Sequence, residues 1–202
     1  MCSRFELKAT PKEIAKRFNL SMYPSIPNTG EYRPTDKILV ITSQGPKIMS
    51  WGLKVNWSPK PLFNARFETL RSKKTFSSLV EARCLIPASA YFEWRKDSQN
   101  KFKNRITLCN IDTFTSMFAF AGLYDGERFT IITCPPAKSI SHIHNRMPVI
   151  INKEREDLWI KLGGSFEKAS NVLAPYQTDK LIAEEYLVIN SPQKDLFRPN
   201  NP

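Results

Sequence analysis

Short hydrophobic runs alternate with polar turn residues along the chain, a pattern typical of β-strands. The runs at residues 37–42 and 47–53 flank Ser43-Gln44-Gly45-Pro46, a turn-forming stretch that predicts a β-hairpin. Asp125-Gly126 predicts a second tight hairpin. Strands are expected across the centre of the chain at residues 83–86, 90–95, 102–109, 116–124 and 128–133. The central part of the chain is therefore expected to form an antiparallel meander.

Helices are expected mainly outside this central region. Thr10, Pro11 and Glu13 offer an N-cap, a first-turn proline and a capping-box acid, which predict a short helix through Phe18. The other expected elements are helices at 73–82, 152–162 and 165–173, strands at 146–151 and 185–189, and irregular segments at 21–34 and 60–69. Many short strands with peripheral helices indicate an α+β fold with a mainly antiparallel, barrel-like β core. Since no linker or repeat divides the sequence, residues 1–202 are expected to form a single domain.

The charge of the chain narrows the class of partner. Its 202 residues include 30 Lys and Arg against 19 Asp and Glu, which gives a net charge of +11. This excess favours a polyanionic partner, such as nucleic acid or an anionic membrane surface, over a basic protein without one. No apolar run approaches the roughly 18 residues of a membrane span, and the N-terminus lacks the apolar core of a secretory signal. A cytoplasmic protein is expected.

The four cysteines set limits on metal and redox chemistry. Cys2, Cys84, Cys109 and Cys134 lie far apart and form no CxxC pair, so neither a zinc ribbon nor a dithiol redox site is indicated. Reduced thiols are expected in the cytoplasm. We expect no bound metal and no cofactor.

Cys2 stands directly behind the initiator methionine. Removal of Met1, which a small second residue permits, would leave one residue with an α-amine and a thiol on adjacent carbons. Such a 1,2-aminothiol traps aldehydes. Taken alone, Cys2 is more typical of a small, half-buried hydrophobic residue.

Two further residues could move protons. Glu93 has aromatic residues on both sides, a setting that would raise its pKa and suit it to proton transfer near neutral pH; the alternative is a strand-edge acid facing solvent. His144 follows His142 by two positions, so both would face one side of an extended segment. Because a metal pair would need a third ligand cluster, a functional or hydrogen-bonded His144 is favoured.

Basic and aromatic residues are interleaved as in proteins that bind single-stranded nucleic acid. The candidate phosphate-binding residues are Arg4, Arg66, Lys73, Lys74 and Arg146, and the candidate stacking residues are Trp51, Trp57 and Phe67. Asn64, just before Ala65-Arg66, is by itself typical of a turn asparagine. Each of these residues, taken singly, is more typical of a surface charge or a core aromatic.

Four motifs, taken together, are more informative about function than any of their residues taken singly. They are MCSRF at the start, NARFET at 64–69, RCLIPASAYFEW at 83–94 and HNRMP at 144–148. In this order, they resemble the SOS-response-associated peptidase (SRAP) family, also called the abasic-site processing family. The resemblance spans essentially the whole chain, and Trp51-Gly52 and Ile131-Ile132-Thr133 also match.

The resemblance implies a protein that binds single-stranded DNA and crosslinks itself covalently to abasic sites, with weak lyase activity. Cys2 would form a thiazolidine with the abasic sugar after loss of Met1, Asn64 would orient its amine or the linkage, Glu93 would be the acid/base group, and His144 would lie against the opened sugar. Arg4, Arg66, Thr133 and Arg146 would hold phosphates, and Pro34 and Trp57 would lie nearer the flanking bases. Lys74 is a phosphate contact predicted from the charge pattern. A monomer, associated with the nucleoid when bound to DNA, would be sufficient.

The sequence also departs from the family pattern. Ser3 replaces the usual glycine, Asn145 replaces a common aspartate, and residues 54–57 lack the more usual proline.

Two other functions stay open. One is a cysteine-type self-processing peptidase with Cys2 as nucleophile and His144 as base, which the charge of +11 argues against as the main role. The other is a non-covalent module for single-stranded DNA in which Cys2 is incidental.

Overall fold

Five strands close into a barrel in the computed structural model, which describes residues 2–98, 100–109, 117–161, 164–173 and 181–185. They are β3 (Lys37–Thr42), β4 (Gly45–Trp51), β8 (Arg83–Ala88), β11 (Phe118–Asp125) and β12 (Arg128–Cys134). The order β12-β4-β3-β8-β11 returns to β12, and only the β4–β12 pair is parallel. This barrel confirms the predicted fold class, and both predicted hairpins are present, as β3–β4 and β11–β12.

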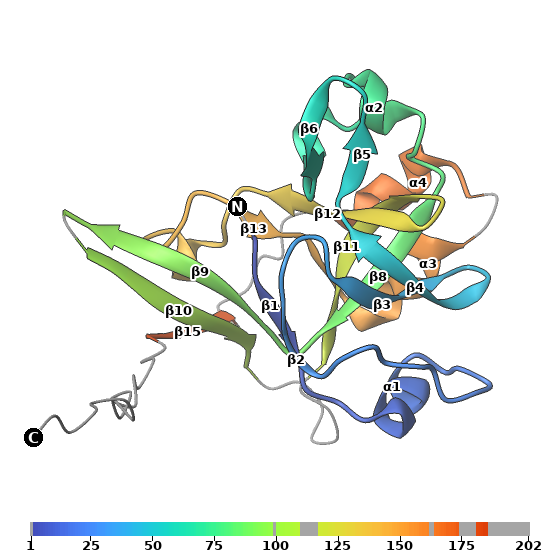
Figure 1. The fold of residues 1–202 in the computed structure, drawn as a ribbon, viewed down its shortest axis with the longest axis horizontal. Helices are drawn as coiled ribbons and strands as arrows, with labels where there is room; N and C mark the ends of the chain where they lie inside the picture. The colour runs from blue at the N-terminus through green and yellow to red at the C-terminus, as the bar shows by residue number, and fades with distance from the viewer. Residues whose placement is uncertain (1, 99, 110–116, 162–163, 174–180, 186–202) are drawn as a thin grey trace, which may run out of the picture.

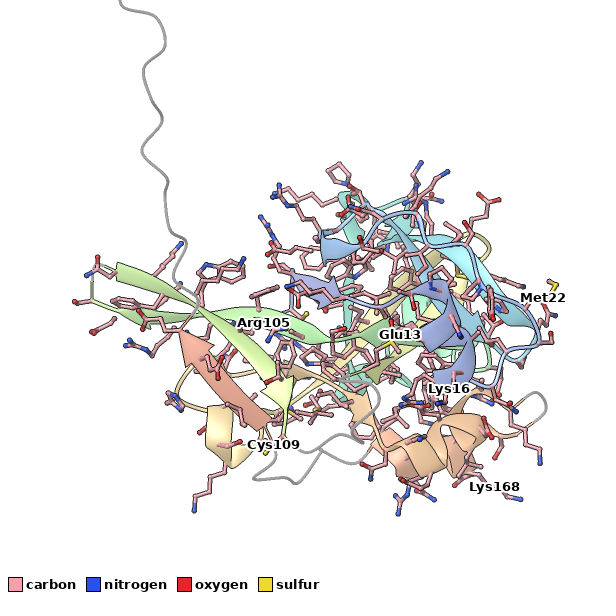
Figure 2. All side chains as sticks on the ribbon, turned by 90° about the horizontal axis from the view of Figure 1, so that it is seen from below. Glu13, Lys16, Met22, Arg105, Cys109 and Lys168 are labelled. Atoms are coloured by element: carbon pink, nitrogen blue, oxygen red, sulfur yellow. The ribbon has the colours of Figure 1, made fainter. Side chains whose placement is uncertain are left out.

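A second, five-stranded sheet has the order β15-β10-β9-β1-β2. Its strands are β1 (Phe5–Leu7), β2 (Gly30–Tyr32), β9 (Ala90–Asp97), β10 (Asn100–Leu108) and β15 (Leu181–Glu185). The β9–β10 hairpin projects from the body of the protein (Figure 1). Figure 2 shows Arg105 where this hairpin meets the body, whereas Glu13 and Lys16 mark helix α1 (Pro11–Arg17) on the other side.

The predicted central meander is wrong. β8 and β9 are separated by Ser89 alone, yet β8 pairs with β3 and β11 in the barrel, whereas β9 pairs with β1 and β10 in the second sheet. The chain passes from one sheet to the other at Ser89, whose N–H donates to the Glu6 carbonyl at 2.7 Å. Since β1 and β2 have three residues each, they are too short to show the alternation by which strands are recognised.

The remaining elements are short. The strands are β5 (Leu53–Val55), β6 (Ser58–Leu62), β7 (Asn64–Arg66), β13 (Met147–Pro148) and β14 (Ile150–Ile151); the helices are α2 (Lys74–Ser77), α3 (Glu156–Ile160) and α4 (Phe166–Ser170); the 3-10 turns are η1 (Phe67–Thr69), η2 (Lys138–Ile140), η3 (Lys153–Arg155) and η4 (Asn171–Leu173). Within the described ranges, no helix has the length and apolar character needed to cross a membrane.

Several predicted boundaries change. The capping box of α1 is present, since Thr10 accepts from the Glu13 N–H and Glu13 accepts from the Thr10 N–H. Residues 60–69, expected to be irregular, contain part of β6 and all of β7 and η1, and the helix expected at 73–82 is only α2. The strand expected at 146–151 is divided into β13 and β14. The last strand ends at residue 185 rather than beginning there, and residues 186–189 lie outside the described ranges.

An aromatic cluster joins β1 to the barrel. The Phe5 ring lies 5.3 Å from the rings of both Tyr32 and Trp51 and 5.7 Å from that of Phe120, measured between centroids. Because the Phe5 side chain is completely buried, it anchors the start of the chain in the core. Cys2 is only three residues away, so its position follows from this packing.

Candidate active site

Cys2 is completely buried, against the inner part of β9. Its thiol donates to the Arg4 carbonyl oxygen at 3.6 Å, and the same oxygen accepts the Phe92 N–H at 2.9 Å. Burial raises the pKa of the Cys2 thiol well above its ordinary value. The thiol is therefore protonated near neutral pH.

Asn64 holds the main chain of Cys2. It is the first residue of β7, which pairs in parallel with β12, and its Nδ2 donates to the Cys2 carbonyl oxygen at 2.7 Å. Its Oδ1 is buried, and no described residue donates a hydrogen bond to it. Asn64 thus fixes Cys2 and still offers an acceptor to another group.

Glu93 supplies a buried carboxyl group. It lies on β9, two residues after Tyr91, so both side chains emerge on the same face of the strand. Burial raises the pKa of Glu93 from 4.5 to about 7. Near neutral pH this carboxyl group is populated in both its protonated and its ionised form, as a group that gives and takes protons requires.

His144 lies against Glu93. Its Nε2 is 3.9 Å from Glu93 Oε2, and its Nδ1 accepts the Arg146 N–H at 3.0 Å. Because Nδ1 acts as an acceptor, the neutral ring carries its proton on Nε2, which faces the carboxylate. Burial also lowers the pKa of His144, which favours the neutral ring.

Arg146, Thr133 and Arg66 lie together beside these groups. Arg146 Nη2 donates to the Thr133 carbonyl oxygen at 2.6 Å, and Thr133 is paired with Arg66 in the β7–β12 register. Glu68 binds both Nη1 and Nη2 of Arg146, at 2.5 and 2.9 Å. The arrangement offers two guanidinium groups to an anion, one of them already held by a carboxylate. The ion pair between Glu68 and Arg146 is not among the sequence predictions, although Glu68 lies within the NARFET motif.

Arg4 is held in a similar way. Its Nη1 lies 2.5 Å from Glu31 Oε1, and the other carboxylate oxygen of Glu31 lies 2.6 Å from Lys103 Nζ. The Lys103 ammonium also lies 4.0 Å from the centroid of the Phe92 ring. Glu31 and Lys103 come from strands distant in sequence, so no local motif could have identified this arrangement.

Three predicted DNA-binding residues lie on separate surface segments rather than with the Cys2 group. Pro34 lies between β2 and β3, Trp57 in the turn between β5 and β6, and Lys74 at the start of α2. Trp57 is 69% exposed, which leaves its ring available for stacking. The β5–β6 hairpin and α2 both appear at the top of the view in Figure 1.

A cavity of about 370 Å³ lies at the β5–β6 hairpin. Its polar lining residues are Thr35, Lys54, Asn56, Ser58 and Arg128. The two cations and the hydroxyl and amide groups suit it to an anionic or polar group. No group of three or more His, Cys, Asp or Glu side chains within the described ranges is placed to hold a metal ion.

Comparison with known proteins identifies the family. The family described as "SOS response associated peptidase (SRAP)" matches residues 1–188. The abasic site processing protein YoqW of Bacillus subtilis is 33% identical over 96% of each chain, and YedK of Escherichia coli, with the same description, is 26% identical over 86% of each. A crystal structure of a Bacteroides thetaiotaomicron protein shares the fold, with a TM-score of 0.79 over 93% of each chain at 24% identity. This chain therefore belongs to the SOS response associated peptidase (SRAP) family.

Proposed function

We propose that this protein processes abasic sites in single-stranded DNA by forming a covalent thiazolidine through Cys2 after Met1 is removed. The observation that carries the proposal is the hydrogen bond from Asn64 to the Cys2 main chain, together with the pairing of Glu93 on β9 with His144 from the segment before β13. Relatives covering 96% and 86% of the chain are named abasic site processing proteins, which supports the same substrate.

The first step is attack of the Cys2 α-amine on the aldehyde of the ring-opened abasic sugar. An α-amine has a pKa of about 7.7–8.0 against ~10.4 for lysine, so it is far more often unprotonated near neutral pH. A carbon–nitrogen bond forms, and the carbinolamine loses water when Glu93 donates a proton to the departing hydroxyl group. Asn64 Oδ1, which has no donor among the described residues, accepts an amine N–H and orients the nitrogen.

The second step closes the ring. The Cys2 sulfur attacks the imine carbon, which gives a five-membered thiazolidine. Thiol and amine belong to one residue, so the step is intramolecular, and effective molarities in such reactions reach about 10⁵ M or more. Because burial keeps the thiol protonated, the amine reacts before the sulfur does.

His144 completes the proton path. Its Nε2–H faces Glu93 at 3.9 Å and can donate to the sugar oxygen during ring opening. When the reaction stops at the imine, the same pair can remove a sugar proton and promote strand cleavage. The weak lyase activity follows from this second outcome.

The basic residues hold the DNA strand around the lesion. Arg66 and Arg146 lie beside the site on either side of the completely buried Thr133, and Arg4 lies two residues from Cys2. Pro34, Trp57 and Lys74 would contact the flanking nucleotides from the surface segments already described. One copy of the chain supplies all four reacting groups, so we propose that a monomer acts.

Peptide hydrolysis is less well supported by the same geometry. A cysteine peptidase needs a thiolate activated by an adjacent base. Here the Cys2 thiol donates to the Arg4 carbonyl, its pKa is raised by burial, and His144 faces Glu93. These observations favour the aldehyde reaction, in which a neutral amine acts first.

The first prediction is that adduct formation depends on the aldehyde. Protein incubated with a single-stranded oligonucleotide carrying one abasic site should gain the mass of that oligonucleotide less one water, starting from a chain that has lost Met1. The same oligonucleotide with a tetrahydrofuran analogue, which has no aldehyde, should bind without adding mass. Intact-mass spectrometry checks both. If the chain begins at Cys2 and no adduct forms, the covalent proposal is wrong. Non-covalent DNA binding and peptide hydrolysis would then be the remaining functions to test.

The second prediction concerns Glu68, whose carboxylate occupies the two Nη atoms that a phosphate would use on Arg146. Glu68→Gln removes this competing charge, so affinity for intact single-stranded DNA should rise up to about fivefold, the equivalent of an exposed ion pair worth ~1 kcal/mol. Fluorescence anisotropy at low salt measures it. Glu127→Gln, the same charge change at an exposed residue between β11 and β12, is the control. Equal affinities for the two variants would show that Glu68 does not compete with DNA.

A further inference from the structure

The Tyr91 hydroxyl group is buried at the candidate site without a hydrogen bond. The side chain has no exposed surface, and none of the described residues offers its hydroxyl a partner. Burying an unpaired hydroxyl lowers the stability of a fold. A group kept in this state on the strand of Glu93 is therefore a candidate for a role that appears only when substrate is bound.

Packing fixes the direction of the Tyr91 ring. Tyr91 is paired with Phe5 of β1 on one side and with Ile106 of β10 on the other. Its ring meets the Phe120 ring edge-on, with centroids 6.0 Å apart and planes at 80°. These buried neighbours restrict the ring, so its hydroxyl group stays on the face of β9 from which the Glu93 side chain also emerges.

The Cys2 sulfur lies against the same stretch of β9. Cys2 bonds to the Arg4 carbonyl, which also accepts the N–H of Phe92, the residue between Tyr91 and Glu93. Burial raises the pKa of Tyr91 well above its ordinary value, and charge on Cys2, Glu93 or Cys134 would raise it further. The hydroxyl group is therefore protonated and available as a donor.

We propose that the Tyr91 hydroxyl donates a hydrogen bond to the Cys2 sulfur during ring closure and is a further catalytic residue. This inference rests on the proposed function. In the step, the thiol proton passes to the Glu93 carboxylate, the carbon–sulfur bond forms, and the π electron pair of the protonated imine moves onto its nitrogen. Negative charge develops on sulfur as its proton leaves and before the carbon–sulfur bond is complete, and in a buried site a donor stabilises that charge more than it would in water.

The other groups of the site have different tasks. Asn64 Nδ2 is engaged with the Cys2 carbonyl oxygen, and His144 Nε2 faces Glu93. Glu93 must be ionised to take the thiol proton. Tyr91 therefore supplies the hydrogen-bond donor that the sulfur lacks.

Tyr91→Phe tests the proposal, because it removes only the hydroxyl oxygen. Two readouts separate the steps with saturating abasic oligonucleotide: borohydride trapping reports the imine, and a heat-stable adduct without borohydride reports the thiazolidine. Imine formation should keep its wild-type rate, whereas conversion to the stable adduct should slow about 10- to 100-fold, the loss expected for a hydrogen bond to a charged atom. Tyr124→Phe on β11 is the matched control and should change neither rate. The melting temperature of Tyr91→Phe should equal or exceed that of the wild type.

The possible results distinguish a failure of the Tyr91 inference from a failure of the proposed function on which it rests. If the wild-type protein forms no adduct, the proposed function fails and the role of Tyr91 fails with it. If the wild-type protein forms the adduct and Tyr91→Phe converts imine to thiazolidine equally fast, only the inference is overturned. A variant that melts lower and loses imine formation and DNA affinity together would show that Tyr91 is structural, which also overturns it.

Discussion

Replacing Cys2 with alanine should abolish the heat-stable adduct and leave the borohydride-trapped adduct in place. Alanine also permits removal of Met1, so the variant keeps an α-amine that can form the imine. It lacks the sulfur that closes the ring, and the imine hydrolyses when the sample is denatured. Denaturing gels run with and without borohydride, together with intact masses, measure the two species.

Two further variants make this result specific. Cys109→Ala removes a different, half-buried thiol next to the end of β10 and should behave as wild type. Cys2→Ser keeps a nucleophile on the adjacent carbon but offers a poorer one, so its heat-stable product should be greatly reduced. If Cys2→Ala still formed a heat-stable adduct, the linkage would involve another side chain, and the thiazolidine mechanism would be wrong.

Glu93→Gln should lower the rate of crosslinking and raise stability at neutral pH. Loss of a positioned acid/base group typically costs about 10²–10⁴ in rate. Burial raises the pKa of Glu93 to about 7, so the ionised carboxylate destabilises the folded state. Below pH 4.5 Glu93 is protonated in both the folded and the unfolded state, and the free energy of unfolding is at its highest with respect to this group. It falls by about 3 kcal/mol in total as the pH rises from 4.5 through 7. The Glu93→Gln variant has no charge to bury at this position, so its free energy of unfolding should not fall in this way.

Urea unfolding at pH 4.5 and pH 8 measures this effect. The free energy of unfolding of the wild type should fall more steeply over this interval than that of Glu93→Gln, and the difference between the slopes belongs to Glu93. Glu127→Gln, at an exposed position, controls for the loss of one negative charge. Parallel profiles for wild type and Glu93→Gln would mean that Glu93 titrates normally and has no special capacity for proton transfer at neutral pH.

Local signals made parts of the fold predictable. The capping box at Thr10 and Glu13 and the hairpin turns at Gly45 and Gly126 depend on residues close in sequence, and the structure contains all of them. The division of the strands between two sheets depends on contacts distant in sequence. The change of sheet at Ser89 has no local signal, because β8 and the start of β9 are equally buried.

The candidate site likewise has a part that the sequence predicts and a part that it does not. Motifs predict Cys2, Asn64, Glu93 and His144 as site residues because the residue types and their order carry the resemblance. The partners of the basic residues could not be read from the sequence, since Glu68 and Arg146 are 78 positions apart. From the sequence, Tyr91 is only one of the aromatic residues near Glu93, because the missing partner of its hydroxyl is a property of the folded structure.

The four groups of the candidate site come from segments near residues 2, 64, 93 and 144, which meet only when β1, β7, β9 and the chain before β13 are all in place. Contacts of such large sequence separation form late in folding, after local hairpins and helices. A nascent or partly folded chain thus exposes an aminothiol without the amide and carboxyl groups that direct it. If the proposed crosslinking is correct, we expect it only from the completely folded chain.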